Sequence, residues 1–298
     1  MSLQKTLIKT YFGSVSTMAP QFAARNAFKL FQKVRKKNIR EREEKFFQDA
    51  RKFNVEAELD HGKTEHINCY ELGEAGKPLV ILVHGWDSNA GSMSKIAYQL
   101  VAEGRRVVLF NLPGHAFYKR SFTNLLECRE AFSAVLKVIN PEPGFSVVSH
   151  SFGSAVTAYA LSKNDYQLDK LVFLTNPNKV ERIFEDFRNF IGLGDRAYNK
   201  LLEMAQQKLG EPIQKVNVVD NLSKIDFEKI LLIHDKNDKV LDYYNSLEVK
   251  EAISKAELLT YENIGHYKML WNDMVITDCT RFLSGTSSHF IKEEVANP

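Results

Sequence analysis

Five short runs of the chain consist almost wholly of apolar residues. Strands buried on both faces of a parallel sheet have this pattern, because helices cover them from either side. The runs are 79–83, 107–110, 145–148, 171–174 and 230–233. Predicted helices alternate with them at 93–102, 125–138, 154–161, 243–253 and 269–282, and a last strand is predicted at 256–261. This alternation predicts an α/β fold with a mostly parallel sheet and helices on both faces.

Two segments ahead of these runs, 53–59 and 66–72, alternate apolar and polar residues. A period of two is typical of strands with one face in water. His61, Gly62 and Lys63 lie between the segments and predict an antiparallel hairpin. The hairpin brings the predicted sheet to about eight strands.

The alternation of strand and helix is interrupted once, at residues 178–218, where helical patterns flank Ile191-Gly192-Leu193-Gly194. An insertion after a parallel strand lies near the carboxyl ends of the sheet, where open α/β folds bind ligands. We therefore predict a small helical cap at 178–218, inserted into a core formed by 53–177 and 219–285. The polar residues 286–298 are predicted to be a frayed tail.

The first 52 residues form a basic arm, with 13 Lys/Arg against 4 Asp/Glu in a chain whose net charge is +3. Apolar residues recur at helical spacing between Pro20 and Phe53, which predicts one or two amphipathic helices with a break near residues 33–38. Residues 1–18 lack strong periodicity, so we expect them to be loosely ordered. A basic arm can bind an anionic membrane or nucleic acid. The stripe of Phe22, Phe28 and Phe31 instead favours packing on the body of the protein.

The composition is that of a soluble globular protein, with 44% hydrophobic and 26% charged residues among 298. No apolar run approaches the roughly 18 residues that span a bilayer, and the first residues do not resemble a secretory signal. Cys69, Cys128 and Cys279 are scattered and lack metal-ligand spacing. They suit a reducing compartment, so we expect a cytoplasmic protein without a metal site or a disulfide framework.

A candidate nucleophile lies in the middle of the chain, where Ser149-His150-Ser151-Phe152-Gly153 joins a predicted strand to a predicted helix. The Ser-x-Ser-x-Gly pattern is a near match to the Gly-x-Ser-x-Gly nucleophile elbow, which holds a serine on a strained turn. Ser149 replaces the first glycine with another small residue. Taken alone, the motif equally fits an ordinary loop whose serine caps the helix.

His84-Gly85-Trp86-Asp87 follows the apolar run at 79–83, some 65 residues before the candidate serine. A serine nucleophile requires backbone N–H groups that stabilise the oxyanion of its tetrahedral intermediate. The donors predicted for this arrangement are the backbone N–H groups of Trp86 and Phe152.

A histidine base and an acid are expected after the last two strands. Gly265 permits a sharp turn that presents His266 over the sheet. Asp235 and Asp238 both follow the strand at 230–233, and we favour Asp238 because the loop there is expected to curl inward. Five other histidines are interpreted as structural: His61, His66, His115, His234 and His289.

Taken together, these motifs resemble the α/β-hydrolase superfamily over roughly residues 53–284. More narrowly, the chain is similar to bacterial esterase- and lipase-like members that carry a basic helical arm like residues 19–52. Those members share His-Gly-Trp, Pro-Gly-His, His-Ser-Phe-Gly, His-Asp-x-x-Asp-x-x-Val and Gly-His, all present here. The resemblance implies an α/β-hydrolase fold and the chain order Ser151, Asp238, His266 for nucleophile, acid and base.

The predicted function is therefore that of a cofactor-free serine hydrolase that cleaves an ester-like acyl bond of a small molecule through an acyl-enzyme. Five cap residues favour a substrate with an apolar group: Phe184, Phe187, Phe190, Ile191 and Leu193. Three alternatives stay open. The same triad could act on a thioester, amide or carbon–carbon bond; the protein could be a membrane-surface, lipase-like enzyme; or the scaffold could bind ligands without catalysis.

Overall fold

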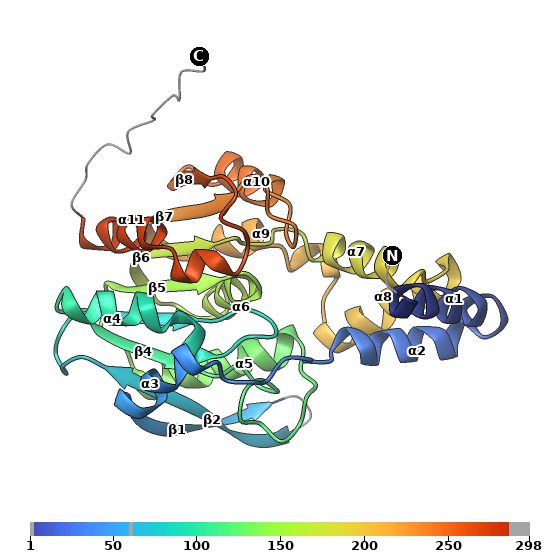
Figure 1. The fold of residues 1–298 in the computed structure, drawn as a ribbon, viewed down its shortest axis with the longest axis horizontal. Helices are drawn as coiled ribbons and strands as arrows, with labels where there is room; N and C mark the ends of the chain where they lie inside the picture. The colour runs from blue at the N-terminus through green and yellow to red at the C-terminus, as the bar shows by residue number, and fades with distance from the viewer. Residues whose placement is uncertain (1–2, 60–61, 286–298) are drawn as a thin grey trace, which may run out of the picture.

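The computed structural model describes residues 3–59 and 62–285, and it contains a sheet of eight strands (Figure 1). The spatial order is β1 (Arg51–Leu59), β2 (Lys63–Leu72), β4 (Arg106–Phe110), β3 (Leu79–Val83), β5 (Phe145–His150), β6 (Gln167–Leu174), β7 (Asp226–Asp235) and β8 (Ala256–Tyr261). β2 runs antiparallel to β1 and β4, and the other neighbouring pairs are parallel. The predicted fold class is confirmed.

Apolar side chains on successive strand residues enter two different cores. Ile81 and Val147 are register partners that point into the core on one face, whereas Val80 and Val148 point into the core on the other face. The first face is covered by α5 (Leu125–Ile139), α6 (Phe152–Leu161), α9 (Val218–Leu222) and α10 (Tyr244–Ala252). The second is covered by α3 (Glu41–Asp49), η2 (Ala90–Met93), α4 (Ser94–Ala102), η4 (Lys268–Trp271) and α11 (Asp273–Ser284). Burial on both faces explains why the central stretches of these strands are almost wholly apolar.

The predicted hairpin consists of β1 and β2, with Val55 opposite Ile67. β1 starts at Arg51, two residues earlier than expected, and directly follows α3. Part of the expected turn, residues 60–61, and the expected tail, 286–298, lie outside the described residues.

The expectation of a loosely ordered amino terminus is wrong, because α1 (Leu3–Met18) is helical. Phe12 is buried, whereas Leu7, Tyr11 and Met18 are exposed on a different face of the helix. Since apolar residues occupy both faces, they form no single stripe, and the helical period is hidden in the sequence.

A separate helical layer projects from the sheet domain (Figure 1). It combines α1 and α2 (Pro20–Phe31) from the arm with α7 (Val180–Ile191), α8 (Asp195–Leu209) and η3 (Ile213–Lys215) from the insertion after β6. We call it the arm–cap layer. Ala23, Ala24 and Ala27 are fully buried where α2 packs on α8, and the layer shares one apolar core with Tyr159 of α6.

Two residues of the predicted phenylalanine stripe, Phe28 and Phe31, therefore pack against the core of the arm–cap layer rather than on the sheet. Phe31 stacks on Phe184 with ring centroids 4.4 Å apart and meets Phe187 at 5.1 Å. Phe22 is 55% exposed and is not part of this contact. The small, fully buried alanines of α2 allow the helices of this layer to approach one another closely.

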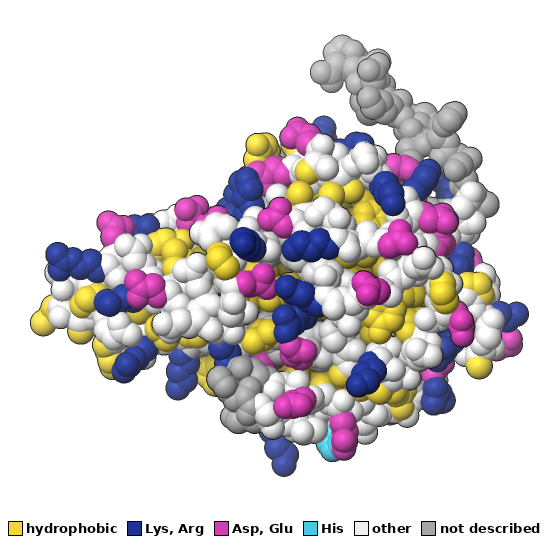
Figure 2. All heavy atoms as spheres, turned by 180° about the vertical axis from the view of Figure 1, so that it is seen from behind, with side chains coloured by type: hydrophobic (Ala, Val, Ile, Leu, Met, Phe, Trp, Pro, Cys, Tyr) yellow, Lys and Arg dark blue, Asp and Glu magenta, His cyan; other side chains and the backbone are white. Residues whose placement is uncertain are grey.

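Apolar, acidic and basic side chains are interspersed over both the projecting layer and the rest of this face (Figure 2). Within residues 3–59 and 62–285, no helix combines the length and the hydropathy that crossing a membrane requires.

Phe31→Ala is expected to lower the free energy of unfolding by about 2 kcal/mol, because it removes a half-buried ring and two aromatic contacts. The matched control is Phe22→Ala, which truncates an exposed ring of the same helix and should change stability by less than about 0.5 kcal/mol. Urea unfolding followed by circular dichroism measures both. Equal effects of the two substitutions would contradict the packing of the arm on the cap.

Candidate active site

Ser151 lies on a strained turn between β5 and α6, with φ 54° and ψ −123°. Positive φ is costly for a residue with a side chain and persists only where the surroundings impose it. Here the N–H of Ser151 donates to the carbonyl of Leu174 on β6 at 2.9 Å. A Cβ at Gly153 would lie 2.4 Å from the carbonyl oxygen of Val83, so only glycine fits there.

Ser149, the first small residue of the elbow motif, occupies a position where a side chain larger than that of glycine fits. Ser149 is fully buried, and its hydroxyl is hydrogen bonded to that of Thr157 on α6 at 2.7 Å. This bond satisfies the polar atom that serine adds at a position where the elbow motif has glycine.

The structure brings together the three side chains for which the sequence predicts catalytic roles. The Ser151 hydroxyl donates to Nε2 of His266 at 2.9 Å, and Nδ1–H of His266 donates to Oδ2 of Asp238 at 2.7 Å. Ser151 and His266 are buried, at 8% and 5% exposed, and the side chain of Asp238 is 0% exposed. The chain of hydrogen bonds is the geometry needed to move a proton from the serine to the imidazole.

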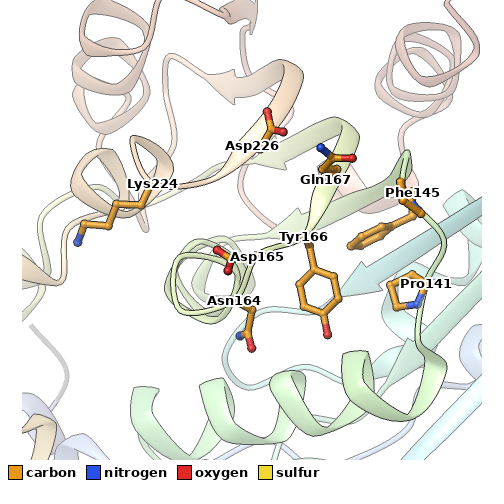
Figure 3. Close-up of a pocket in the computed structure, with 9 residues that line it drawn as sticks. Pro141, Phe145, Asn164, Asp165, Tyr166, Gln167, Lys224 and Asp226 are labelled. Carbon is orange, nitrogen blue, oxygen red and sulfur yellow. The ribbon is translucent and has the colours of Figure 1, made fainter.

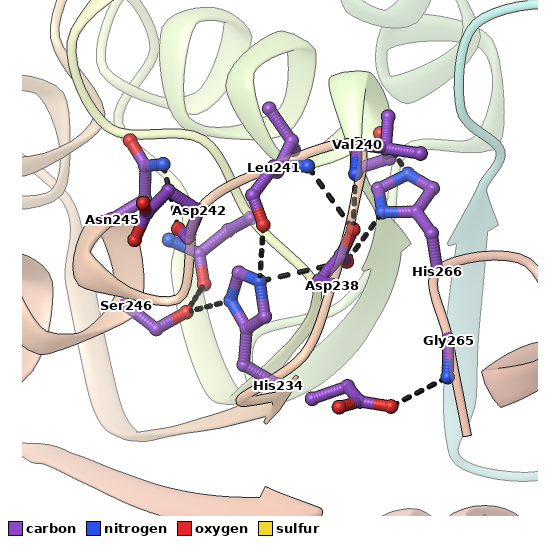
Figure 4. Close-up of polar contacts among 12 residues, drawn as sticks. His234, Asp238, Val240, Leu241, Asp242, Asn245, Ser246, Gly265 and His266 are labelled. Atoms are coloured by element: carbon purple, nitrogen blue, oxygen red, sulfur yellow. Dashed lines mark hydrogen bonds and ion pairs between the residues drawn. The ribbon is translucent and has the colours of Figure 1, made fainter. Parts of the chain in front are cut away.

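Asp238 is held by its own loop (Figure 4). Its Oδ1 accepts the N–H groups of Val240 at 2.7 Å and Leu241 at 3.1 Å. His234 supports the same loop, because its Nε2 is 3.1 Å from the Leu241 carbonyl. Burial works against ionisation of Asp238, but the hydrogen bond and charge of His266 and the two N–H groups hold its pKa below the usual value.

Asp235, the competing aspartate, is the last residue of β7, three residues before Asp238, and has a different set of partners. Its carboxylate accepts the N–H groups of Asn237 at 2.7 Å, Asn263 at 3.2 Å and Gly265 at 2.5 Å. Asp235 thus ties the loop after β7 to the loop that carries His266, and Asp238 makes the contact with the imidazole.

The predicted oxyanion donors belong to two segments that meet beside Ser151. A Cβ at Gly85 would lie 3.1 Å from Cβ of Ser151, so the backbone before Trp86 passes directly along the serine. The Trp86 ring packs edge-on against Phe152 at 5.0 Å and against His115 at 5.2 Å. His84 Nε2 accepts the N–H of Leu112 at 3.0 Å and fixes the start of this loop. We call residues 84–88 the oxyanion loop, after their predicted role.

Two residues near the site have contacts that the sequence did not reveal. His150 precedes the serine, and its Nε2 is 3.0 Å from the carbonyl oxygen of His266. Asp87 follows Trp86 and accepts hydrogen bonds from the arm. The only sequence signal for either residue was its position next to a motif. The contacts themselves could not be predicted, because the partner of His150 lies 116 residues away along the chain and that of Asp87 lies 52 residues away.

Buried histidines beside the site predict acid sensitivity. Burial lowers the pKa of His115 to about 4 and that of His150 to about 3. The unfolded chain binds these protons near pH 6.5, so it gains them before the folded protein does. Stability is therefore lost as the pH falls from 6.5 towards 4, by about 3 kcal/mol for His115 alone. His115→Gln should flatten the pH dependence of urea unfolding over this range, and an unchanged slope would contradict the assignment.

A hollow of about 500 Å³ lies elsewhere, at the amino ends of β5, β6 and β7 (Figure 3). Phe145, Gln167 and Asp226 are the first residues of these strands, and all three line it. Ser151 follows the carboxyl end of β5, so the hollow and the candidate site lie at opposite ends of the strands.

The described residues contain no group of three or more His, Cys, Asp or Glu side chains arranged to hold a metal ion. The thiols of Cys69, Cys128 and Cys279 are buried, and burial raises the pKa of Cys69 and Cys128 to about 12.

Comparison with known proteins gives a consistent result. A family model described as the alpha/beta hydrolase fold matches residues 78–194. Among curated proteins, no sequence matches significantly. Three solved structures illustrate the similarity in shape. Rv0554 from Mycobacterium tuberculosis is 13% identical, with a TM-score of 0.62 over 79% of this chain and 100% of its own.

A carboxylesterase structure from the thaumarchaeon Nitrososphaera gargenis is 15% identical, with a TM-score of 0.58 over 77% of this chain and 99% of its own. A bacterial membrane phospholipase A is 18% identical, with a TM-score of 0.58 over 95% of this chain and 97% of its own. At these identities the similarity bears on the fold. Together with the order of the strands and the matched family model, it leads to one conclusion: the chain has the α/β-hydrolase fold.

Proposed function

We propose that the protein is a serine hydrolase that cleaves an ester-like acyl bond. The observation that carries this proposal is the continuous hydrogen-bonded chain from Ser151 Oγ through His266 to Asp238, built on a strained turn. Strain of this kind is retained where the surrounding fold enforces it, often at functional sites. A scaffold that only binds ligands has no need for the aligned serine, imidazole and carboxylate.

In the proposed reaction, Ser151 Oγ attacks the acyl carbon as His266 Nε2 takes the hydroxyl proton. Asp238 stabilises the resulting imidazolium, and the N–H groups of Trp86 and Phe152 bind the oxyanion. Collapse of the intermediate breaks the acyl bond, and His266 returns the proton to the leaving alcohol. Water then attacks the acyl-enzyme with the same general base, releasing the acid and restoring the serine.

The substrate proposed is a small ester with an apolar acyl or alcohol group. The cap residues expected to bind it contribute to packing instead, because Phe184, Ile191 and Leu193 are buried in the arm–cap layer. The preference for an apolar group now rests on the rings of Trp86 and Phe152, which lie at the serine.

The test combines covalent labelling with a ladder of p-nitrophenyl esters from acetate to decanoate. The full-length protein should react with a fluorophosphonate probe and hydrolyse the shorter esters. Matched thioester and anilide substrates separate the proposed ester specificity from action on other acyl bonds. Faster hydrolysis of the anilide than of the ester would overturn the ester assignment, and a folded protein that neither reacts nor hydrolyses would overturn the function.

A lipid ester at a membrane surface is the second candidate. Leu7, Tyr11 and Met18 are exposed apolar side chains on one face of α1, in an arm that is rich in Lys and Arg. The similarity to a membrane phospholipase A covers 95% of this chain. Co-sedimentation with anionic vesicles at two salt concentrations tests it, because electrostatic binding must weaken as salt rises.

A further inference from the structure

The segment between α2 and α3, residues 33–40, runs from the arm–cap layer back across the body of the protein (Figure 1). We call it the strap. Val34 is buried, and its N–H donates to the carbonyl of Ser121 at 2.9 Å. The Lys37 ammonium donates to the carbonyls of Tyr118 and Arg120. These contacts fix the strap to the loop that precedes α5.

The strap is joined to the oxyanion loop by one carboxylate. Oδ1 of Asp87 accepts the backbone N–H groups of Arg35 at 2.7 Å and Lys36 at 3.3 Å. Oδ2 lies 3.5 Å from Nε of Arg35, but that side chain is 65% exposed whereas the carboxylate is 8% exposed. Since exposed ion pairs contribute little, the two backbone hydrogen bonds are the main link.

Asp87 adopts an unfavourable backbone conformation, with φ 54°. A residue with a side chain stays at positive φ only where its partners hold it there. Trp86, directly before it, has its ring fixed against Phe152 and His115. The peptide groups around Trp86 are thus held on one side by ring packing and on the other by the strap.

The strap also reaches the loop that carries the histidine. The Lys36 ammonium lies 5.8 Å from the centre of the Tyr267 ring, which in turn packs edge-on against His266 at 4.9 Å. Residues 35–36 therefore contact both loops that flank Ser151.

We propose that Asp87 is a positioning residue: by accepting the strap N–H groups, it holds the oxyanion loop so that the Trp86 N–H faces the reacting carbonyl. The inference rests on the proposed function, since it concerns the same site. If the link is lost, Asp87 relaxes from positive φ, the loop shifts, and the oxyanion is stabilised less well while substrate binding is largely retained.

Asp87→Ala is therefore expected to lower kcat for p-nitrophenyl acetate by about 10- to 100-fold, with KM within about threefold of wild type. Asp87→Asn keeps an oxygen that can accept the two N–H groups and should restore kcat to within about threefold. Equal losses in the two variants would overturn the proposal, because the backbone link would then not be what matters.

The strap side of the link provides an independent pair of variants. Arg35→Ala removes only the exposed ion pair and should leave kcat unchanged, whereas Arg35→Pro also removes the N–H donor and should reproduce the loss seen in Asp87→Ala. Wild-type kcat in Arg35→Pro would overturn the proposal.

Val135→Ala is the control for stability, because this fully buried side chain of α5 belongs to the core on the first sheet face, outside the strap and the oxyanion loop. It should lower the melting temperature with kcat within about threefold.

Hydrogen exchange of the peptide covering residues 84–93 gives a readout that requires no catalysis. Asp87→Ala and Arg35→Pro should accelerate its exchange relative to wild type and to Arg35→Ala. Unchanged exchange overturns the positioning role even if the protein proves inactive on esters. Inactivity of the wild type with accelerated exchange in the variants would instead reject the proposed function and support the link.

Discussion

Ser151→Ala is expected to lower kcat for ester hydrolysis by about 10⁵- to 10⁶-fold and to abolish labelling by a fluorophosphonate. The hydroxyl of Ser151 is 2.9 Å from Nε2 of His266, and its removal leaves no nucleophile in contact with the base. Steady-state kinetics and mass mapping of the labelled peptide measure the two effects. Stability should change little, since the substitution keeps the turn and removes one oxygen.

Ser154→Ala is the matched control for this result. Ser154 is also buried and lies three residues along the chain, but its hydroxyl donates to the carbonyl of Ser149. The variant should be labelled like the wild type. Labelling at a residue other than Ser151, or persistent labelling of Ser151→Ala, would contradict the assignment of the nucleophile.

Asp238→Asn is expected to lower kcat by about 10⁴-fold. Val240 and Leu241 donate to Oδ1, so the amide oxygen will take that position and the NH₂ group will face Nδ1 of His266. Because Nδ1 then faces the NH₂ donor, it must act as an acceptor, and the imidazole proton moves to Nε2. A protonated Nε2 cannot accept the hydroxyl proton of Ser151. The pH profile and kcat of the variant measure this change of tautomer.

Asp235→Asn separates the roles of the two aspartates. Asp235 holds the N–H groups of Asn237, Asn263 and Gly265, so weakening it should cost about 1–3 kcal/mol of stability. Its kcat should fall far less than that of Asp238→Asn. If Asp235→Asn proves the more damaging to kcat and Asp238→Asn the more damaging to stability, the acid would be Asp235.

Much of the sheet domain was predictable because its signals are local. A run such as 79–83 is apolar at every position since its residues serve two cores in turn, and this can be seen without knowing the partners. The positions of Ser151 and His266 were predictable because each follows a strand in a motif of a few residues. The preference for Asp238 over Asp235 required an expected loop shape, and the contact with His266 agrees with it.

The arm was less predictable because its partners are remote in sequence. Phe31 packs on Phe184, and Asp87 accepts N–H groups of Arg35 and Lys36. The periodicity of a short segment does not show which other amphipathic surface it will pack against. It also does not show which carboxylate will accept a backbone N–H group. The helix α1 was missed for a related reason. Its apolar residues lie on both faces, so the sequence lacks the single apolar stripe from which an amphipathic helix is recognised.

The composite origin of the arm–cap layer has a consequence for synthesis of the chain. α2 leaves the ribosome early, but α8, which covers its alanine face, is not complete until residue 209 has been added. At about 5–20 residues per second, the nascent arm waits roughly ten to forty seconds with its apolar face in water. During that interval the growing polypeptide offers a binding segment to chaperones, and slow translation through the middle of the message would lengthen its exposure.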